Sequence, residues 1–195
     1  MKLFAAALAL TVAFTGLVAP STADACAMKV RLPDIEMVAD NHFKKGVRAE
    51  EQGQARAAIR HFERAMNADG SKATRADAAL RAARLHQSLG RTERAIARMT
   101  RGVAINGEHF DLRLALGRAL VQKDAAGAIA QLEAARDLDR LSAEVYPELA
   151  IAHARLGQRE EAQRYLTTAK GLGAAPERVI AAEKALAGVA GVAVL

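Results

Sequence analysis

Five histidines and one cysteine are the residues of this chain best suited to metal binding, acid–base catalysis or nucleophilic attack. A helical histidine zinc site needs two histidines four residues apart, as in a His-Glu-x-x-His run, and no such pair is present. A single cysteine, Cys26, excludes an intrachain disulfide and a cysteine-based structural zinc site. Gly-x-Ser-x-Gly turns, phosphate loops and dinucleotide fingerprints are also missing. The sequence therefore predicts no enzyme, no metal site and no cofactor.

Four acidic residues recur at similar intervals: Asp40, Asp77, Asp111 and Glu144. Carboxylates could act as general acids or bases, but each of these precedes or begins a segment with helical patterning. An acidic residue at a helix start accepts hydrogen bonds from free backbone amides and complements the helix dipole. We therefore expect the four residues to open helices.

Arginine gives the strongest charge signal. Residues 44–101 contain 14 lysines and arginines against six acidic residues, a net charge of +8, whereas residues 102–195 carry a net charge of −1. Two arginine stripes lie in the basic half, at Arg56, Arg60 and Arg64 and at Arg94, Arg98 and Arg101. The guanidinium group binds carboxylates and phosphates in a bidentate way, so the stripes could hold an acidic protein or an anionic surface. A solvated surface without a partner is an equally open interpretation.

The N-terminus has the features of an export signal. Lys2 precedes an uncharged run of 16 residues (3–18), and residues 23–25 form the small-x-small cleavage pattern Ala-Asp-Ala. We expect residues 1–25 to be a signal peptide and the mature chain to be periplasmic or secreted. Cleavage after Ala27, an uncleaved membrane anchor, and lipoprotein anchoring through Cys26 are the alternatives.

A repeat of about 34 residues predicts the fold. Four alanines, Ala58, Ala95, Ala128 and Ala162, are separated by 37, 33 and 34 residues. A bulky apolar residue follows each alanine by four positions, and a small residue follows that by three: Phe62/Ala65, Met99/Gly102, Leu132/Ala135 and Leu166/Ala169. These spacings place all three residues on one helical face. Gly53, Gly90 and Gly157 precede three of the alanines by five residues, where a helix end needs a left-handed residue.

This pattern resembles the tetratricopeptide repeat (TPR), most closely in the first and fourth segments. The first segment matches at Gly46, Gly53, Ala58, Phe62 and Ala65, and the fourth at Tyr146, Leu149, Ala150, His153, Gly157, Ala162, Leu166 and Ala169. In this register His42, His86 and His153 occupy aromatic packing positions of the family. His61 lies beside Phe62, and His109 precedes a predicted helix.

The resemblance implies an all-α, right-handed superhelical solenoid of about four helix-turn-helix repeats. The expected organisation is an irregular lead-in (26–38), repeats across 39–172 (about 39–72, 76–108, 109–141 and 142–174), a capping helix (175–187) and an apolar tail (188–195). A capping helix is expected because a repeat array must cover the apolar face of its last repeat.

The family binds partner segments in a concave groove lined by the first helix of each repeat. The residues that this register places in the groove are Arg84, Gln87, Arg118, Val121 and Arg155, together with Val47, Glu50, Leu80, Leu114 and Ile151. An equally open interpretation is that the arginines among them pair with acidic residues of a neighbouring helix. We therefore expect a non-catalytic periplasmic scaffold that binds a cell-envelope protein and no nucleic acid. The alternatives are an electrostatic adaptor that docks on anionic lipid or polysaccharide through the basic repeats, and an accessory domain of an envelope enzyme complex.

Overall fold

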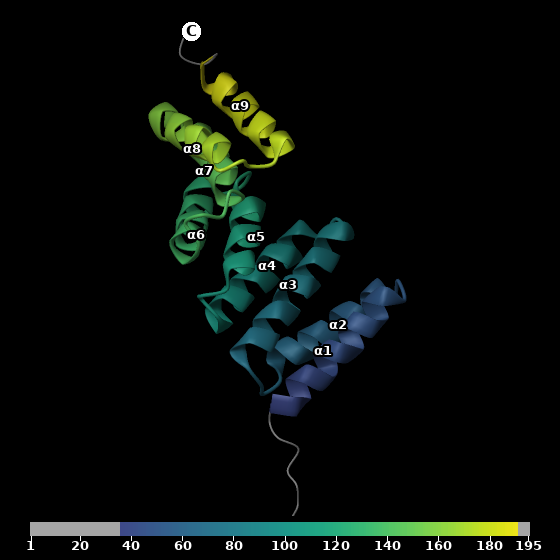
Figure 1. The fold of residues 1–195 in the computed structure, drawn as a ribbon. Coiled ribbons are helices and arrows are strands. Elements are labelled where there is room, and N and C mark those ends of the chain that lie inside the picture. The colour runs from purple at the N-terminus through teal and green to yellow at the C-terminus, as the bar shows by residue number, and fades with distance from the viewer. Residues whose placement is uncertain (1–35, 191–195) are drawn as a thin grey trace, which may run out of the picture. The chain divides into compact units, whose positions relative to one another are not determined.

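The computed structural model describes residues 36–190, and all regular secondary structure in this range is helical (Figure 1). Its helices are α1 (Glu36–Glu51), α2 (Ala55–Asn67), α3 (Lys72–Ser88), α4 (Thr92–Ile105), α5 (Phe110–Leu120), α6 (Ala125–Leu138), α7 (Val145–Arg155), α8 (Arg159–Gly171) and α9 (Pro176–Ala190). The predicted signal peptide, Cys26 and the end of the apolar tail lie outside the described residues.

Consecutive helices pair as antiparallel hairpins, α1 with α2, α3 with α4, α5 with α6 and α7 with α8. Gly53, Gly90 and Gly157 have φ values of 70°, 69° and 75° in three of the hairpin turns, which confirms their predicted left-handed role. The turn between α5 and α6 has no glycine. There, Asp124 accepts a hydrogen bond from the Gly127 amide at 2.8 Å and so caps α6.

The core is a series of small clusters, each built from one hairpin and the first helix of the next. Phe62 and Met66 of α2 pack with alanines of α1 and α3, and Met99 of α4 packs with residues of α3 and α5. Leu132 of α6 lies between α5 and α7, and Leu166 of α8 lies between α7 and α9. Each of α3, α5 and α7 therefore contributes to two neighbouring clusters.

The four marker alanines and their bulky partners are buried, as the repeat predicts. Small residues allow the helices to approach closely. A Cβ atom added to Gly102 of α4 would lie 2.7 Å from Ala79 Cβ of α3 and 2.8 Å from Leu112 Cδ1 of α5. Glycine is therefore required by packing at this position, where three helices meet.

The prediction that acidic residues open the first helix of each repeat is wrong for Asp40 and Asp77. Asp40 lies inside α1, and Asp77 lies inside α3, which Ser71 caps by accepting from the Thr74 amide at 3.1 Å. Both carboxylates instead bond to side chains of the following repeat. Asp111 does lie in the first turn of α5, but the side chain that caps this helix is His109. Glu144 occupies the N-cap position of α7 without a side-chain cap bond.

The ends of the repeat array differ from the expected boundaries by a few residues. Helix α1 begins at Glu36, inside the lead-in expected to be irregular, because no proline or glycine interrupts the chain between Pro33 and Gly46. Helix α9 continues to Ala190, three residues past the expected end at 187, because Gly188 is tolerated within it. It packs on α7 and α8 through Ala182, which is fully buried, as a capping helix must.

Bilayer crossing requires a long apolar helix, and no helix in residues 36–190 meets that requirement.

Gly102→Ala should lower the free energy of unfolding by about 1–3 kcal/mol, because the added methyl group has no space between Ala79 and Leu112. The matched control is Gly188→Ala, whose new Cβ would meet nothing within 4 Å, so that the better helix propensity of alanine leaves stability unchanged or slightly raised. Chemical denaturation followed by circular dichroism measures both. Equal effects of the two substitutions would contradict the packing argument.

Candidate functional site

Polar contacts that span about one repeat length join neighbouring repeats. They connect side chains 31 to 35 residues apart: Asp40 with Thr74, Glu50 with Arg81, Glu63 with Arg98, and Asp77 with His109. The donor–acceptor distances are 2.7, 2.8, 2.8 and 2.9 Å. These contacts pair several charged side chains of the basic segment (residues 44–101) with one another or with a neighbouring repeat. Other cations of that segment are not paired in this way and are available to bind a partner.

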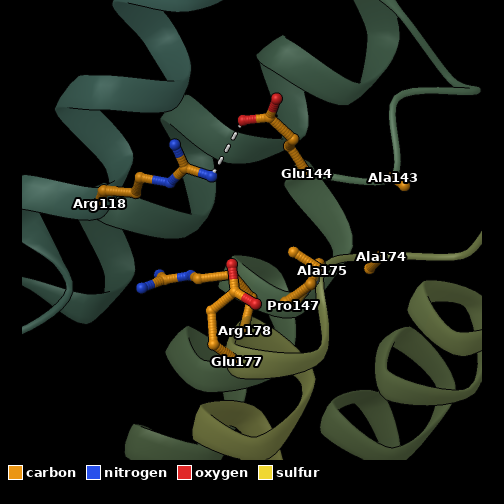
Figure 2. Close-up of a pocket in the computed structure, with 8 residues that line it drawn as sticks. All are labelled: Arg118, Ala143, Glu144, Pro147, Ala174, Ala175, Glu177 and Arg178. Carbon is orange, nitrogen blue, oxygen red and sulfur yellow. Dashed lines mark hydrogen bonds and ion pairs between the residues drawn. The ribbon is translucent and has the colours of Figure 1, made fainter.

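The first candidate site is a cleft between α5, α7 and α9, which we call the odd-helix cleft. Its volume is about 580 Å³. Its lining combines cations, one carboxylate, one amide and small or aliphatic side chains: Arg118, Val121, Gln122, Glu148, Ile151, Arg155, Arg178, Ala181, Lys184 and Ala185. A hollow of about 410 Å³ that shares Arg118 and Arg178 lies beside it. Figure 2 shows this hollow, with the Arg118–Glu144 ion pair and the side chain of Arg178.

Glu148 is the centre of the odd-helix cleft. Its side chain is 2% exposed, yet it carries a carboxylate. Arg118 Nε donates to Glu148 Oε1 at 2.8 Å, and Arg178 Nη2 donates to the same oxygen. Arg118 also pairs with Glu144 at 3.2 Å. The buried carboxylate thus draws one guanidinium from α5 and one from α9 to the same point on α7.

Two further cations of the odd-helix cleft, Arg155 and Lys184, form no ion pair with any described residue. The Nε of Arg178 is buried and has no hydrogen-bond partner among residues 36–190. Four cations therefore line the cleft, while the buried Glu148 offsets only part of their charge. The site can accept an anionic group beside the apolar surface of Val121 and Ile151.

The second candidate site is a cleft formed by α2, α3 and α4, which we call the arginine cleft. Its volume is about 370 Å³. Five arginines, one acidic residue, one histidine and one aliphatic residue line it: Arg56, Arg60, Arg91, Arg94, Arg98, Glu63, His86 and Ile59. Arg98 holds Glu63, with Nη2 at 2.6 Å from Oε1. The other four arginines pair with no acidic residue within 36–190.

His86, on α3, contributes to the lining of the arginine cleft. Its side chain is 4% exposed, and neither ring nitrogen has a hydrogen-bond partner in the part of the chain that the structure describes. The nearest carboxylate oxygen, of Glu63, is 3.7 Å from Nε2, too far for a hydrogen bond. Burial, followed by the charges of Arg98 and Arg91, lowers the pKa of His86, although Glu63 acts in the opposite direction.

The groove residues expected from sequence fall into three groups. Arg118, Val121, Ile151 and Arg155 line the odd-helix cleft. Leu80 and Leu114 are buried in the core and do not face a groove, because α3 and α5 each pack in two clusters.

The remaining groove residues lie on α1 and α3, away from the odd-helix cleft. Arg84 and Gln87 are exposed on α3, and neither lines one of these clefts. Glu50 is held by Arg81, and Val47 packs against the first cluster.

The two arginine stripes predicted separately meet in one place. Arg56 and Arg60 of the first stripe line the arginine cleft together with Arg94 and Arg98 of the second, whereas Arg64 and Arg101 do not line it. Sequence reasoning missed Arg91, Glu148, Arg178 and Lys184. For Glu148 and Arg178, the separation of 30 residues, close to one repeat, was the available signal.

The remaining histidines have structural contacts. His153 stacks on Tyr165 with ring centroids 5.2 Å apart, and His42 stacks on His61 at 6.3 Å. His109 caps α5 and bonds to Asp77. In the part of the chain that the structure describes, no group of three potential metal ligands comes together.

Comparisons with known proteins identify the fold. No model of a protein family matches the chain, and no curated protein matches its sequence. Solved structures do match. YrrB, a TPR protein with an unusual peptide-binding site, is 20% identical, with a TM-score of 0.62 over 75% of this chain and 74% of YrrB. MamA is 17% identical, with a TM-score of 0.59 over 78% of this chain and 91% of MamA. Pseudomonas aeruginosa PilF is 20% identical, with a TM-score of 0.57 over 70% of this chain and 62% of PilF.

Stacked helical hairpins with a terminal capping helix define a repeat solenoid. The chain has the tetratricopeptide-repeat fold, which confirms the fold predicted from the repeat.

Glu148→Gln should lower the free energy of unfolding by about 2 kcal/mol, because it removes the negative charge that two guanidinium groups share. Glu108→Gln is the matched control, since Glu108 is exposed, lies between α4 and α5 and pairs with no cation among residues 36–190; its effect should stay within about 0.5 kcal/mol. Urea denaturation at neutral pH measures the difference. Equal stability of the two variants would contradict the central role of Glu148.

Stability should fall as the pH falls from neutrality through the ordinary histidine pKa of 6.5. Burial lowers the pKa of His86, so the unfolded chain binds protons at pH values where folded His86 stays neutral, and protonation favours unfolding. His86→Tyr should flatten this dependence, because tyrosine does not titrate between pH 5 and 7.

His61, whose pKa burial also lowers, should account for part of the remaining slope in the His86→Tyr variant. Thermal unfolding at pH 5, 6 and 7 tests the prediction. A slope that is the same with and without His86 would contradict it.

Proposed function

We propose that this protein is a non-catalytic scaffold that binds a protein partner through the odd-helix cleft. The observation that carries the proposal is the lining of that cleft, where Arg118, Arg155, Arg178 and Lys184 surround the aliphatic side chains of Val121 and Ile151. A binding site with a few fixed polar groups beside apolar surface can orient an extended peptide and also desolvate it. Repeat arrays commonly bind partners across the surface made by successive repeats.

The partner segment should carry at least one carboxylate. Glu148 already satisfies one face of Arg118 and Arg178, and so holds both guanidinium groups in fixed orientations. Preorganised side chains lose less conformational freedom when they bind, and arginine binds carboxylates in a bidentate way. Arg155 and Lys184 supply the uncompensated charge. The apolar surface should preserve part of the affinity at high salt, because apolar contacts are not screened.

The N-terminal sequence supports a proposal about where the partner is located. We propose that residues 1–25 direct export and that the partner is a protein of the cell envelope. Lys2, the uncharged run and the Ala-Asp-Ala pattern support this proposal. Lipid attachment at Cys26 would place the same scaffold on a membrane surface.

The alternative function, docking on anionic lipid or polysaccharide through the basic repeats, rests on the arginine stripes. Four stripe residues lie around a single cleft. A cleft of about 370 Å³ suits a small anionic group better than an extended surface. No observation favours the second alternative, an accessory domain of an envelope enzyme complex.

Site-specific photo-crosslinking in cells tests the scaffold proposal. A photoreactive amino acid at Gln122, in the odd-helix cleft, should yield a discrete crosslinked protein, whereas the same amino acid at exposed Gln163 on α8 should not. Arg155→Glu with Lys184→Glu should reduce the Gln122 crosslink at least tenfold, because both substitutions reverse charges that face the bound segment.

The matched control for charge is Arg159→Glu with Arg164→Glu, two exposed positions on α8, which should leave the crosslink unchanged. A crosslink at Gln122 that survives the cleft variant and disappears in the α8 variant would show that the partner binds elsewhere.

A further inference from the structure

The arginine cleft concentrates positive charge, of which only Arg98 takes part in an ion pair between described repeats, with Glu63. Arg56 and Arg60 are four residues apart on α2, and Arg94 and Arg98 are four residues apart on α4, so both pairs are like-charge neighbours on a helix face. Such pairs destabilise an isolated helix. The only carboxylate in the lining, Glu63, is already engaged by Arg98.

The positions of these arginines near helix N-termini add a second unfavourable contribution to the stability of the fold. Arg56 lies in the first turn of α2, which has no acidic residue, and Arg94 lies in the first turn of α4. Arg91 occupies the N-cap position of α4 and makes no cap hydrogen bond. A cation in the first turn is unfavourable because the helix dipole is positive there, whereas an anion is favourable. The start of α2, which has no acidic residue, therefore adds to the attraction for a negative group in the cleft, whereas the start of α4 already carries Glu93, which pairs with Lys123.

His86 provides an independent indication of a ligand. A buried polar group without a partner costs free energy, and both nitrogens of His86 lack partners in a lining otherwise dominated by arginine. A neutral imidazole carries one N–H donor, and an anionic oxygen can accept a hydrogen bond from it. An oxyanion in the cleft could thus pair with the guanidinium groups and accept a hydrogen bond from the N–H of the His86 imidazole.

The chemistry of the lining favours phosphate over a peptide carboxylate. Four arginines without ion pairs among residues 36–190 favour an anion with several charges, and Ile59 is the only aliphatic side chain in the lining. A peptide would also need apolar surface, as the odd-helix cleft provides. A phosphate group presents several oxygens to planar guanidinium forks and carries up to two charges.

We propose that the arginine cleft binds a soluble phosphate-bearing anion, such as pyrophosphate or a phosphate monoester. This site lies on α2, α3 and α4, separate from the proposed protein-binding cleft on α5, α7 and α9. It does not depend on the scaffold function.

Titration of the purified protein with inorganic pyrophosphate at constant ionic strength tests the proposal. Isothermal titration calorimetry should show saturable binding that Arg60→Gln with Arg94→Gln weakens at least tenfold. Arg64→Gln with Arg101→Gln is the matched control, because it removes the same charge from the same two helices outside the cleft, and it should bind within threefold of the unchanged protein. Pyrophosphate should also raise the pKa of His86, measured by NMR, because a nearby anion favours imidazolium.

Folding of the variants is checked by circular dichroism. All four substituted arginines are exposed, and relief of like-charge repulsion should leave the melting temperature of the cleft variant unchanged or higher. No saturable pyrophosphate binding, or equal loss in both variants, would overturn the proposal. Sedimentation with phosphatidylglycerol vesicles separates the sources of phosphate. Vesicle binding that needs Arg60 and Arg94, without pyrophosphate binding, would assign the cleft to a lipid headgroup and overturn a soluble ligand.

Discussion

Close approach of helices across small residues is the constraint on which the rest of this structure depends. Helices α3, α5 and α7 each pack in two clusters, so each must present apolar residues on two faces while its neighbours stay close. Alanine and glycine make this possible, and Gly102 shows how little space remains. One bulky residue per repeat, such as Phe62 or Leu132, fills the gap that the small residues leave.

This packing fixes the spacing between repeats and therefore decides which polar side chains meet. Side chains about one repeat apart become neighbours, as Asp40 and Thr74 or Glu148 and Arg178 do. Where an arginine lies about one repeat away from a glutamate, as in Glu50 with Arg81 and Glu63 with Arg98, the two side chains form an ion pair that joins the repeats. Other cations have no acidic partner among residues 36–190, and several of these line the odd-helix cleft and the arginine cleft, where a ligand can bind.

The two clefts differ in the way they hold their charge. In the odd-helix cleft a buried carboxylate organises two arginines, and aliphatic side chains lie beside them, which suits a peptide segment. In the arginine cleft, five arginines line the same cleft as His86, whose ring nitrogens have no hydrogen-bond partner among residues 36–190. This lining suits a small, highly charged anion. Natural sequences follow the local rules of stability closely, so departures from those rules are most often found at functional sites.

The sequence by itself determined the fold, because the repeat of Ala58, Ala95, Ala128 and Ala162 and the glycines after the first helices are local signals with direct steric causes. It also indicated some of the arginines that line the two clefts, among them Arg56, Arg60, Arg94, Arg98, Arg118 and Arg155. Their grouping was decided only by the tertiary structure, because a side chain's neighbours in the next repeat depend on how the helices pack. Because of this packing, Leu80 and Leu114, which were predicted to line a groove, are buried in the core. Asp40 and Asp77, which were predicted to open helices, form contacts between repeats. Arg178 donates a hydrogen bond to Glu148, which lies 30 residues earlier in the chain. Periodicity specifies which face of a helix is apolar, but contacts across 30 residues follow from interhelical geometry, which no local pattern contains.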